Sequence, residues 1–231
     1  MKTVGVIGGI GPESTIEYYR FLIAEYRSRV QDDSYPSVLI NSIDLTKMLR
    51  LIEAGELRAV TDYLAGEVLK LARAGADFVV LASNTPHIVF DQLRRRSPVP
   101  MISLVEATCE AARSLNLKRV GLLGTRFTMQ AQFYPIVFSE HDIAVVVPEL
   151  EDQTYIHEKY LGELVKGIIL PETREQLLAI ARRLRERHQV EGIILGGTEL
   201  PLILRDVPSP VVPFLDTTTI HVKRIVAEML S

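Results

Sequence analysis

Two short runs of hydrogen-bonding residues each directly follow an apolar run typical of a buried strand. The first spans Ser83 to His87, after residues 78–82, and the second spans Gly196 to Glu199, after residues 192–195. Hydroxyl, amide and carboxylate groups at such positions can bind a small polar ligand, and His87 and Glu199 could also carry protons. Each run alone could equally be a turn or a helix start, because Ser, Thr and Asn favour both.

A glycine-rich turn follows the first apolar run, residues 3–7. Gly8, Gly9 and Gly11 precede Pro12, a residue that suits the first position of a helix. Backbone N–H groups at such a turn can bind a carboxylate or a phosphate, although a simple tight turn would need the same small residues. A dinucleotide-binding motif is excluded, because Ser14 stands where its third glycine would be.

The composition excludes several classes of function. The chain has 231 residues, 47% of them hydrophobic and 24% charged, which is typical of a globular protein. A net charge of −3 gives no support for a nucleic-acid partner or for an anionic membrane surface. The apolar runs are too short to span a membrane, and the single cysteine, Cys109, excludes a disulfide framework and a multi-cysteine metal site. We therefore expect a soluble, cytoplasmic protein without a metal site.

Short β-branched runs alternate with segments of helical period, which predicts an α/β fold with mainly parallel sheets. We predict strands at residues 3–7, 37–42, 78–82, 101–103, 120–123, 144–147, 192–195 and 211–215. Apolar residues at helical spacing predict helices over residues 16–30, 57–71, 172–187 and 218–230.

The chain also repeats itself. Residues 5–9 resemble residues 121–125, and residues 76–85 resemble residues 190–199, each at an offset of roughly 115 residues. This predicts two similar lobes, related by a pseudo-twofold axis, that face each other across a cleft. We expect one lobe to comprise residues 1–97 with 216–231 and the other to comprise residues 98–215.

Together these motifs resemble the aspartate/glutamate racemase family, whose members racemise amino acids without pyridoxal phosphate. The resemblance covers essentially the whole chain, and the segments at residues 13–20 and 124–129 are most similar to the broad-specificity acidic amino-acid branch. It is carried by Gly8-Gly9 with Pro12, Asn84-Thr85-x-His87, Gly124-Thr125, Gly196-x-Thr198-Glu199 and Pro213-x-x-Asp216. The resemblance implies two flavodoxin-like lobes, no cofactor and a homodimer.

The resemblance also implies a substrate-binding set. Asn84, Thr85, Thr198 and Glu199 match family residues that bind the carboxylate and amino groups of the substrate. Lys166 matches a lysine that pairs with the side-chain carboxylate in some aspartate-specific members, although it could equally be a solvated lysine. Met48 stands near the place where such members carry an arginine, which weakens the case for aspartate specificity. Further residues expected to bind substrate are Gly9, Gly11 and Thr125.

The two residues that would carry out the chemistry differ from the family pattern. The family has a cysteine directly before Asn-Thr and another directly before Thr-Glu, where this chain has Ser83 and Gly197. A serine hydroxyl is a much weaker acid than a thiol, and glycine has no side chain. Cys109 lies within a predicted helix and is expected to be packed in the core. Ordinary two-base racemisation is therefore expected to be weak or absent, and cysteines at both positions are expected to create or strengthen it.

Three functions remain open from the sequence. The first is a racemase-like protein that acts on or binds an acidic amino acid or a similar small carboxylate, with Ser83 and Gly197 at the catalytic positions and His87 or Glu199 as alternative proton carriers. The second is a non-catalytic carboxylate-binding relative. The third is a lyase that needs a single proton donor, such as a decarboxylase.

Overall fold

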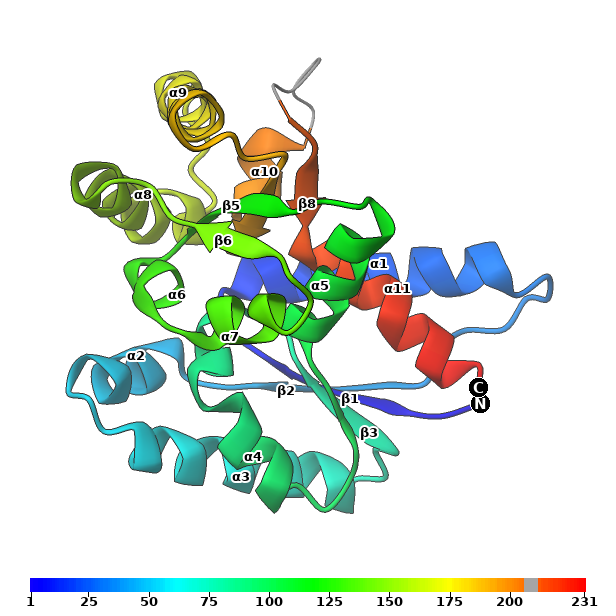
Figure 1. Cartoon of the computed structure of the whole chain (residues 1–231). Helices are drawn as coiled ribbons and strands as arrows, with labels where there is room; N and C mark the ends of the chain where they lie inside the picture. Colours follow the sequence, from blue (N-terminus) through cyan, green and yellow to red (C-terminus); the bar gives the residue numbers. More distant parts are fainter. Residues whose placement is uncertain (206–211) are drawn as a thin grey trace. The chain divides into compact units, whose positions relative to one another are not determined.

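The structure is a computed structural model that describes residues 1–205 and 212–231 (Figure 1). The chain divides into two compact units: unit 1 comprises Met1–Leu104 and His221–Ser231, and unit 2 comprises Val105–Ile220. Each unit contains one four-stranded sheet in which all neighbouring strands are parallel. The predicted α/β fold with two parallel four-stranded sheets is confirmed. The predicted domain boundaries and the pseudo-twofold relation stay predictions.

The sheet of unit 1 has the strand order β2-β1-β3-β4, the order of the flavodoxin-like fold. Strand β1 pairs with β2 and β3 in a register that sets Ile7 beside Asn41 and Leu81. The strands are β1 (Val4–Gly8), β2 (Val38–Ser42), β3 (Phe78–Leu81) and β4 (Met101–Ile102).

Helices cover both faces of this sheet. Residues of α1 and α11 form one hydrophobic cluster with the strand residues Val4, Val6 and Phe78. Figure 1 shows α1 and α11 on one side of β1 and β3, with α3 and α4 on the other. The backbone N–H of Lys2 donates to Met229, so the two ends of the chain lie side by side. The helices are α1 (Pro12–Arg29), α2 (Leu45–Glu53), α3 (Leu57–Arg73), the 3₁₀ helix η1 (Thr85–Val89), α4 (Phe90–Arg96) and α11 (Thr217–Met229).

The sheet of unit 2 repeats the same topology with the order β6-β5-β7-β8. The two central strands, β5 and β7, pair with each other, and Gly124 lies beside Gly196 at their carboxyl ends. Residue 211, the first of the predicted strand 211–215, lies outside the described residues, and the strand there begins at Phe214. The strands are β5 (Arg119–Gly124), β6 (Ala144–Val146), β7 (Gly192–Gly196) and β8 (Phe214–Asp216).

Three helices bury one face of this second sheet. Leu123, Ile193 and Leu195 pack with apolar residues of α8, α9 and α10 in a single cluster. Helices α5 and α7 lie on the other side of the sheet (Figure 1). The helices are α5 (Leu104–Ser114), α6 (Arg126–Gln130), α7 (Phe133–Ser139), α8 (Leu150–Gly162), η2 (Leu164–Lys166), α9 (Pro171–His188) and α10 (Leu200–Leu204).

Candidate functional site

The parallel registers gather the polar runs at the carboxyl edges of the two sheets. In unit 1, Gly8 pairs with Ser42, and the N–H of Ala82 donates to Ile7, so the glycine turn and the Ser83 run begin at the same edge. In unit 2, Gly124 and Gly196 are paired, so Thr125 and Gly197 follow neighbouring strands. Ligands of open parallel sheets bind at this edge. Within each unit, the structure therefore brings the polar runs of that unit to one edge of its sheet, whereas Lys166 lies apart from them at the end of η2.

The glycine turn of unit 1 is held by its own hydrogen bonds. Gly9 and Gly11 adopt positive φ angles, 77° and 89°, and a Cβ on Gly9 would lie 2.5 Å from the Ile43 carbonyl oxygen. The Gly9 N–H donates to the Thr15 hydroxyl (2.9 Å), which in turn donates to the Gly11 carbonyl (3.1 Å). The turn thus requires glycine for steric reasons, and the Gly9 N–H is used within the turn itself.

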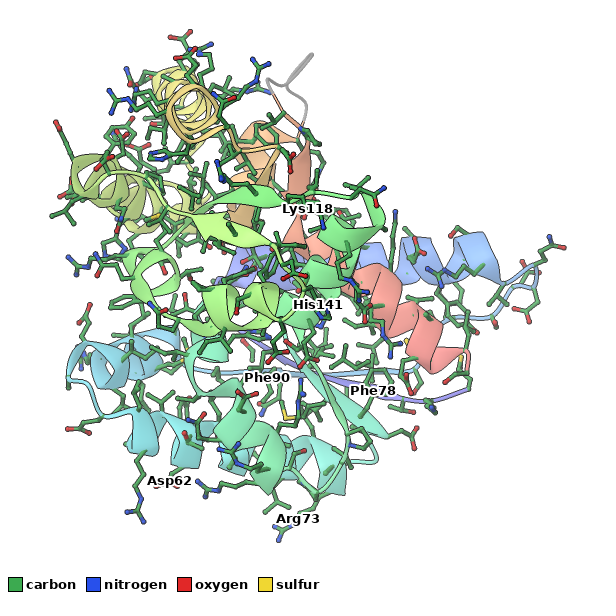
Figure 2. All side chains as sticks on the ribbon, in the orientation of Figure 1. Asp62, Arg73, Phe78, Phe90, Lys118 and His141 are labelled. Carbon is green, nitrogen blue, oxygen red and sulfur yellow. The ribbon has the colours of Figure 1, made fainter. Side chains whose placement is uncertain are left out.

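His87 connects two main-chain segments through its ring. Its Nδ1 lies 3.0 Å from the Ser83 carbonyl oxygen, and its Nε2 lies 3.2 Å from the backbone nitrogen of Leu104, the first residue of α5. A carbonyl can only accept, so Nδ1 carries the proton, and Nε2 accepts from the Leu104 N–H. The ring also stacks on Phe90, which Figure 2 labels, with 4.8 Å between the ring centroids.

Burial keeps this imidazole neutral. His87 is 3% exposed, and burial lowers its pKa to about 4, against the smaller opposite effect of its hydrogen bonds to the main chain at Ser83 and Asn84. A neutral ring with both nitrogens bonded to the main chain is suited to holding the start of α5. These contacts favour the structural interpretation of His87, while its catalytic role stays a prediction.

A second buried histidine, which the sequence did not single out, lies in unit 1. The Tyr18 hydroxyl lies 3.0 Å from His221 Nδ1, and His221 Nε2 lies 3.3 Å from the Ile102 carbonyl oxygen. The carbonyl fixes the proton on Nε2, so Nδ1 accepts from the tyrosine. Burial, followed by the proximity of His87, lowers the pKa of His221 to about 3. Unit 1 therefore buries two neutral histidines.

Three other residues from the sequence analysis have clear local surroundings. Thr125 caps α6, where its hydroxyl accepts from the N–H of Thr128 (3.2 Å). Lys166 ends η2 with an exposed side chain. Cys109 is 1% exposed on α5, and burial raises the pKa of its thiol to about 11, as expected for a packed thiol rather than a reactive one.

The surroundings of Gly197 differ most from what the sequence could indicate. A Cβ built on Gly197 would lie 2.3 Å from Cε2 of Tyr160 and 3.0 Å from its phenol oxygen. Tyr160 comes from α8, and its hydroxyl donates a hydrogen bond to Glu199 Oε2. The Thr198 hydroxyl donates to the same oxygen at 3.0 Å. The aromatic ring therefore fills the space that a side chain at position 197 would occupy.

Sequence analysis missed Tyr160, because it belongs to a helix remote from both polar runs along the chain. The sequence signal was indirect: a glycine among polar residues at the end of a buried strand leaves a space that some other group must fill. Nothing in the sequence indicates which group fills it.

The structure gives two further negative observations. Within residues 1–205 and 212–231, no helix combines the length and the apolar character needed to cross a membrane. In the same part of the chain, no three His, Cys, Asp or Glu side chains are grouped so that they could hold a metal ion.

Comparisons with known proteins agree with the fold and with the sequence motifs. The sequence model of the Asp/Glu/Hydantoin racemase family matches residues 7–225. The broad specificity amino-acid racemase RacX of Bacillus subtilis is 26% identical over 236 residues, which cover 99% of this chain and 98% of RacX. An aspartate racemase homologue from Pyrococcus horikoshii matches with a TM-score of 0.85 and 34% identity over 100% of both chains. The aspartate racemase of Picrophilus torridus shares the fold, with a TM-score of 0.78 and 21% identity over 99% of this chain and 94% of its own.

Proposed function

Because the chain belongs to the Asp/Glu/Hydantoin racemase family, we propose that it binds an acidic amino acid or a similar small carboxylate and racemises it weakly or not at all. The binding part of the proposal is supported by short polar side chains at the carboxyl ends of the strands. Asn84 and Thr85 in unit 1 and Thr198 in unit 2 are each at most 5% exposed. Hydroxyl and amide groups in such positions can hold a carboxylate without requiring a compensating cation nearby.

The contact between Gly197 and Tyr160 is the observation that carries the second part of the proposal. Two-base racemisation needs a group with a suitable pKa on each side of the substrate Cα. At position 197 there is no side chain, and the neighbouring space is filled by an aromatic ring. Ser83 supplies a hydroxyl, and the ring of His87 bonds to the Ser83 carbonyl oxygen.

Calorimetry with both enantiomers of aspartate and glutamate, and with succinate and glutarate, tests the binding. We expect saturable binding at millimolar ligand or below, weakened roughly 10-fold or more by Asn84→Ala and by Thr198→Val, because each removes a buried hydrogen-bonding group. Thr61→Val is the matched control, since Thr61 is also buried but donates to the Leu57 carbonyl within α3. Absence of binding by the unmodified protein, or equal effects of all three variants, would contradict the proposal.

Racemisation is measured on the same ligands by chiral chromatography. We expect little or no conversion between enantiomers at ligand concentrations that saturate binding. Rapid racemisation by the unmodified protein would refute the second part of the proposal while leaving the first intact. The homodimer expected from the sequence belongs to the same proposal, and analytical ultracentrifugation tests it.

A further inference from the structure

Tyr160 and Glu199 form a buried, hydrogen-bonded pair beside the end of β7. Tyr160 is 6% exposed and Glu199 is fully buried. The phenol donates to Glu199 Oε2, and the Thr198 hydroxyl donates to the same oxygen. A phenol bonded to a carboxylate is a pair between which a proton can move, and here a third group fixes the orientation of the carboxylate.

The position of this pair is constrained from the other side by Gly197. The ring edge of Tyr160 approaches the Gly197 backbone so closely that a Cβ there would lie 2.3 Å from Cε2. Only glycine lets the ring lie against the strand end, where its hydroxyl can reach Glu199. The lack of a side chain at Gly197 therefore allows the Tyr160 phenol to lie at the carboxyl edge of the sheet.

The protonation state of the phenol follows from its surroundings. Burial, and then the negative charge of Glu199, raises the pKa of Tyr160 well above its ordinary value. The phenol therefore keeps its proton at neutral pH and can lose it only along the hydrogen bond to Glu199, while its oxygen receives another proton. This is the behaviour of a relay, in which the carboxylate is the final acceptor.

We infer that Tyr160 and Glu199 form a proton relay that exchanges the α-hydrogen of a bound acidic amino acid with solvent on one face only. The inference rests on the proposed function, since it requires that such a ligand binds. In the forward step the Cα–H bond breaks, its proton joins the phenol oxygen, and the original phenol proton passes to Glu199. The electron pair left on Cα delocalises into the neighbouring carboxylate as an enediolate. The carboxyl proton exchanges with water, the carboxyl group and the phenol then interchange their protons along the hydrogen bond, and the phenol returns a solvent hydrogen to the same face of Cα.

Exchange on one face preserves configuration. A thiol pair inverts the substrate because protons can arrive from both sides, whereas in unit 1 the matching position holds Ser83, whose hydroxyl is a poor acid. We therefore expect α-deuterium to enter the ligand in D₂O without formation of the other enantiomer. This outcome separates the relay from a racemase and from a protein that only binds.

Proton NMR in D₂O measures the loss of the α-hydrogen signal, and chiral chromatography of the same samples measures inversion. Tyr160→Phe removes only the hydroxyl, and Glu199→Gln keeps an oxygen that can accept the phenol hydrogen bond but cannot take its proton. Each should slow exchange by at least about 100-fold. Exchange by Glu199→Gln is compared at ligand concentrations that saturate each protein, and its melting temperature should change little. Tyr134→Phe is the matched control, because Tyr134 is a fully buried phenol of unit 2 that bonds to Thr108, and it should exchange at the rate of the unmodified protein.

Each outcome decides between the two proposals. Ligand binding without α-deuteration overturns the relay and leaves the proposed function standing. Unchanged exchange in Tyr160→Phe, or exchange accompanied by equal racemisation, also overturns the relay. Absence of binding overturns the proposed function and the relay together.

Discussion

Replacement of Gly197 by cysteine places a side chain where the ring of Tyr160 lies. The new Cβ would lie 2.3 Å from Cε2 of that ring, whereas carbon atoms pack best at about 3.5–4.0 Å. The ring must therefore withdraw by more than about 1 Å. It is buried and bonded to Glu199, so withdrawal disturbs the packing of α8 and breaks or lengthens that hydrogen bond.

The size of the effect follows from this overlap. Forcing extra atoms into a close-packed core costs about 1–3 kcal/mol. For a chain of this length, each kcal/mol lowers the melting temperature by about 2–4 °C, so Gly197→Cys should melt about 2–12 °C below the unmodified protein. Gly162→Cys is the matched control, because a Cβ on Gly162 in the same unit would meet nothing within 4 Å. That variant should melt close to the unmodified protein.

A third substitution tests whether Tyr160 causes the loss of stability in Gly197→Cys. In the Gly197→Cys background, Tyr160→Leu should remove part of the loss, so that the two changes together destabilise less than their sum by about 0.5–3 kcal/mol. Thermal unfolding followed by circular dichroism measures the unmodified protein, the three single variants and the double variant. Equal melting temperatures for Gly197→Cys and Gly162→Cys, or additive effects of the two changes, would refute the reasoning.

The same overlap alters the expectation from sequence that two cysteines suffice for racemisation. In the variant with Ser83→Cys and Gly197→Cys, the thiol at position 197 and the phenol compete for one space. We expect chiral chromatography to detect racemisation only after Tyr160 is also replaced by a smaller residue. Brisk racemisation by the two-cysteine variant with Tyr160 intact would show that the ring moves aside easily.

Three further predictions concern stability and reactivity. Burial lowers the pKa of His87 to about 4 and of His221 to about 3, whereas an unfolded chain protonates both near pH 6.5. The free energy of unfolding is therefore highest above this pH and decreases below it, by about 2.5 kcal/mol between about pH 7 and pH 5.5. Urea unfolding at several pH values should show this decrease, and His221→Gln should show half of it. Cys109, whose pKa is raised to about 11, should resist iodoacetamide in the native protein and react after unfolding, as mass spectrometry can establish, and ligand binding should survive the treatment. Thr15→Val should destabilise the protein by about 1 kcal/mol in the same urea experiment, because it removes both hydrogen bonds that close the glycine turn; an unchanged midpoint would contradict this role.

The sheets were predictable because their strands are nearly continuous apolar runs. In β3 and β7 every residue is buried, which is the signature of parallel strands covered by helices on both faces. Long amphipathic helices such as α3 were predictable from apolar residues at a period of 3.6. Short helices such as α6 and α10 carry too few turns for such a period, so they were not identified.

The candidate site was predictable only in part. Runs of small polar residues after strands indicate the edge at which a ligand binds, because that edge is fixed by parallel topology. The role of His87 depends on a bond to Leu104, and the filling of the space beside Gly197 depends on a ring from α8. Both are tertiary contacts between segments whose separate sequences contain no sign of each other. The sequence thus locates the missing side chain at position 197 but not the ring that fills its space.

Helix α11 has a consequence for how the chain folds during synthesis. Ile225 and Val226 are fully buried and pack with Val4, Val6 and Tyr18 in the cluster that covers one face of the unit 1 sheet. The ribosome makes this helix only after unit 2. Until then, the apolar face of the unit 1 sheet that α11 covers stays exposed. Until α11 has been made, the first half of the nascent chain therefore exposes an apolar surface of the kind that chaperones recognise.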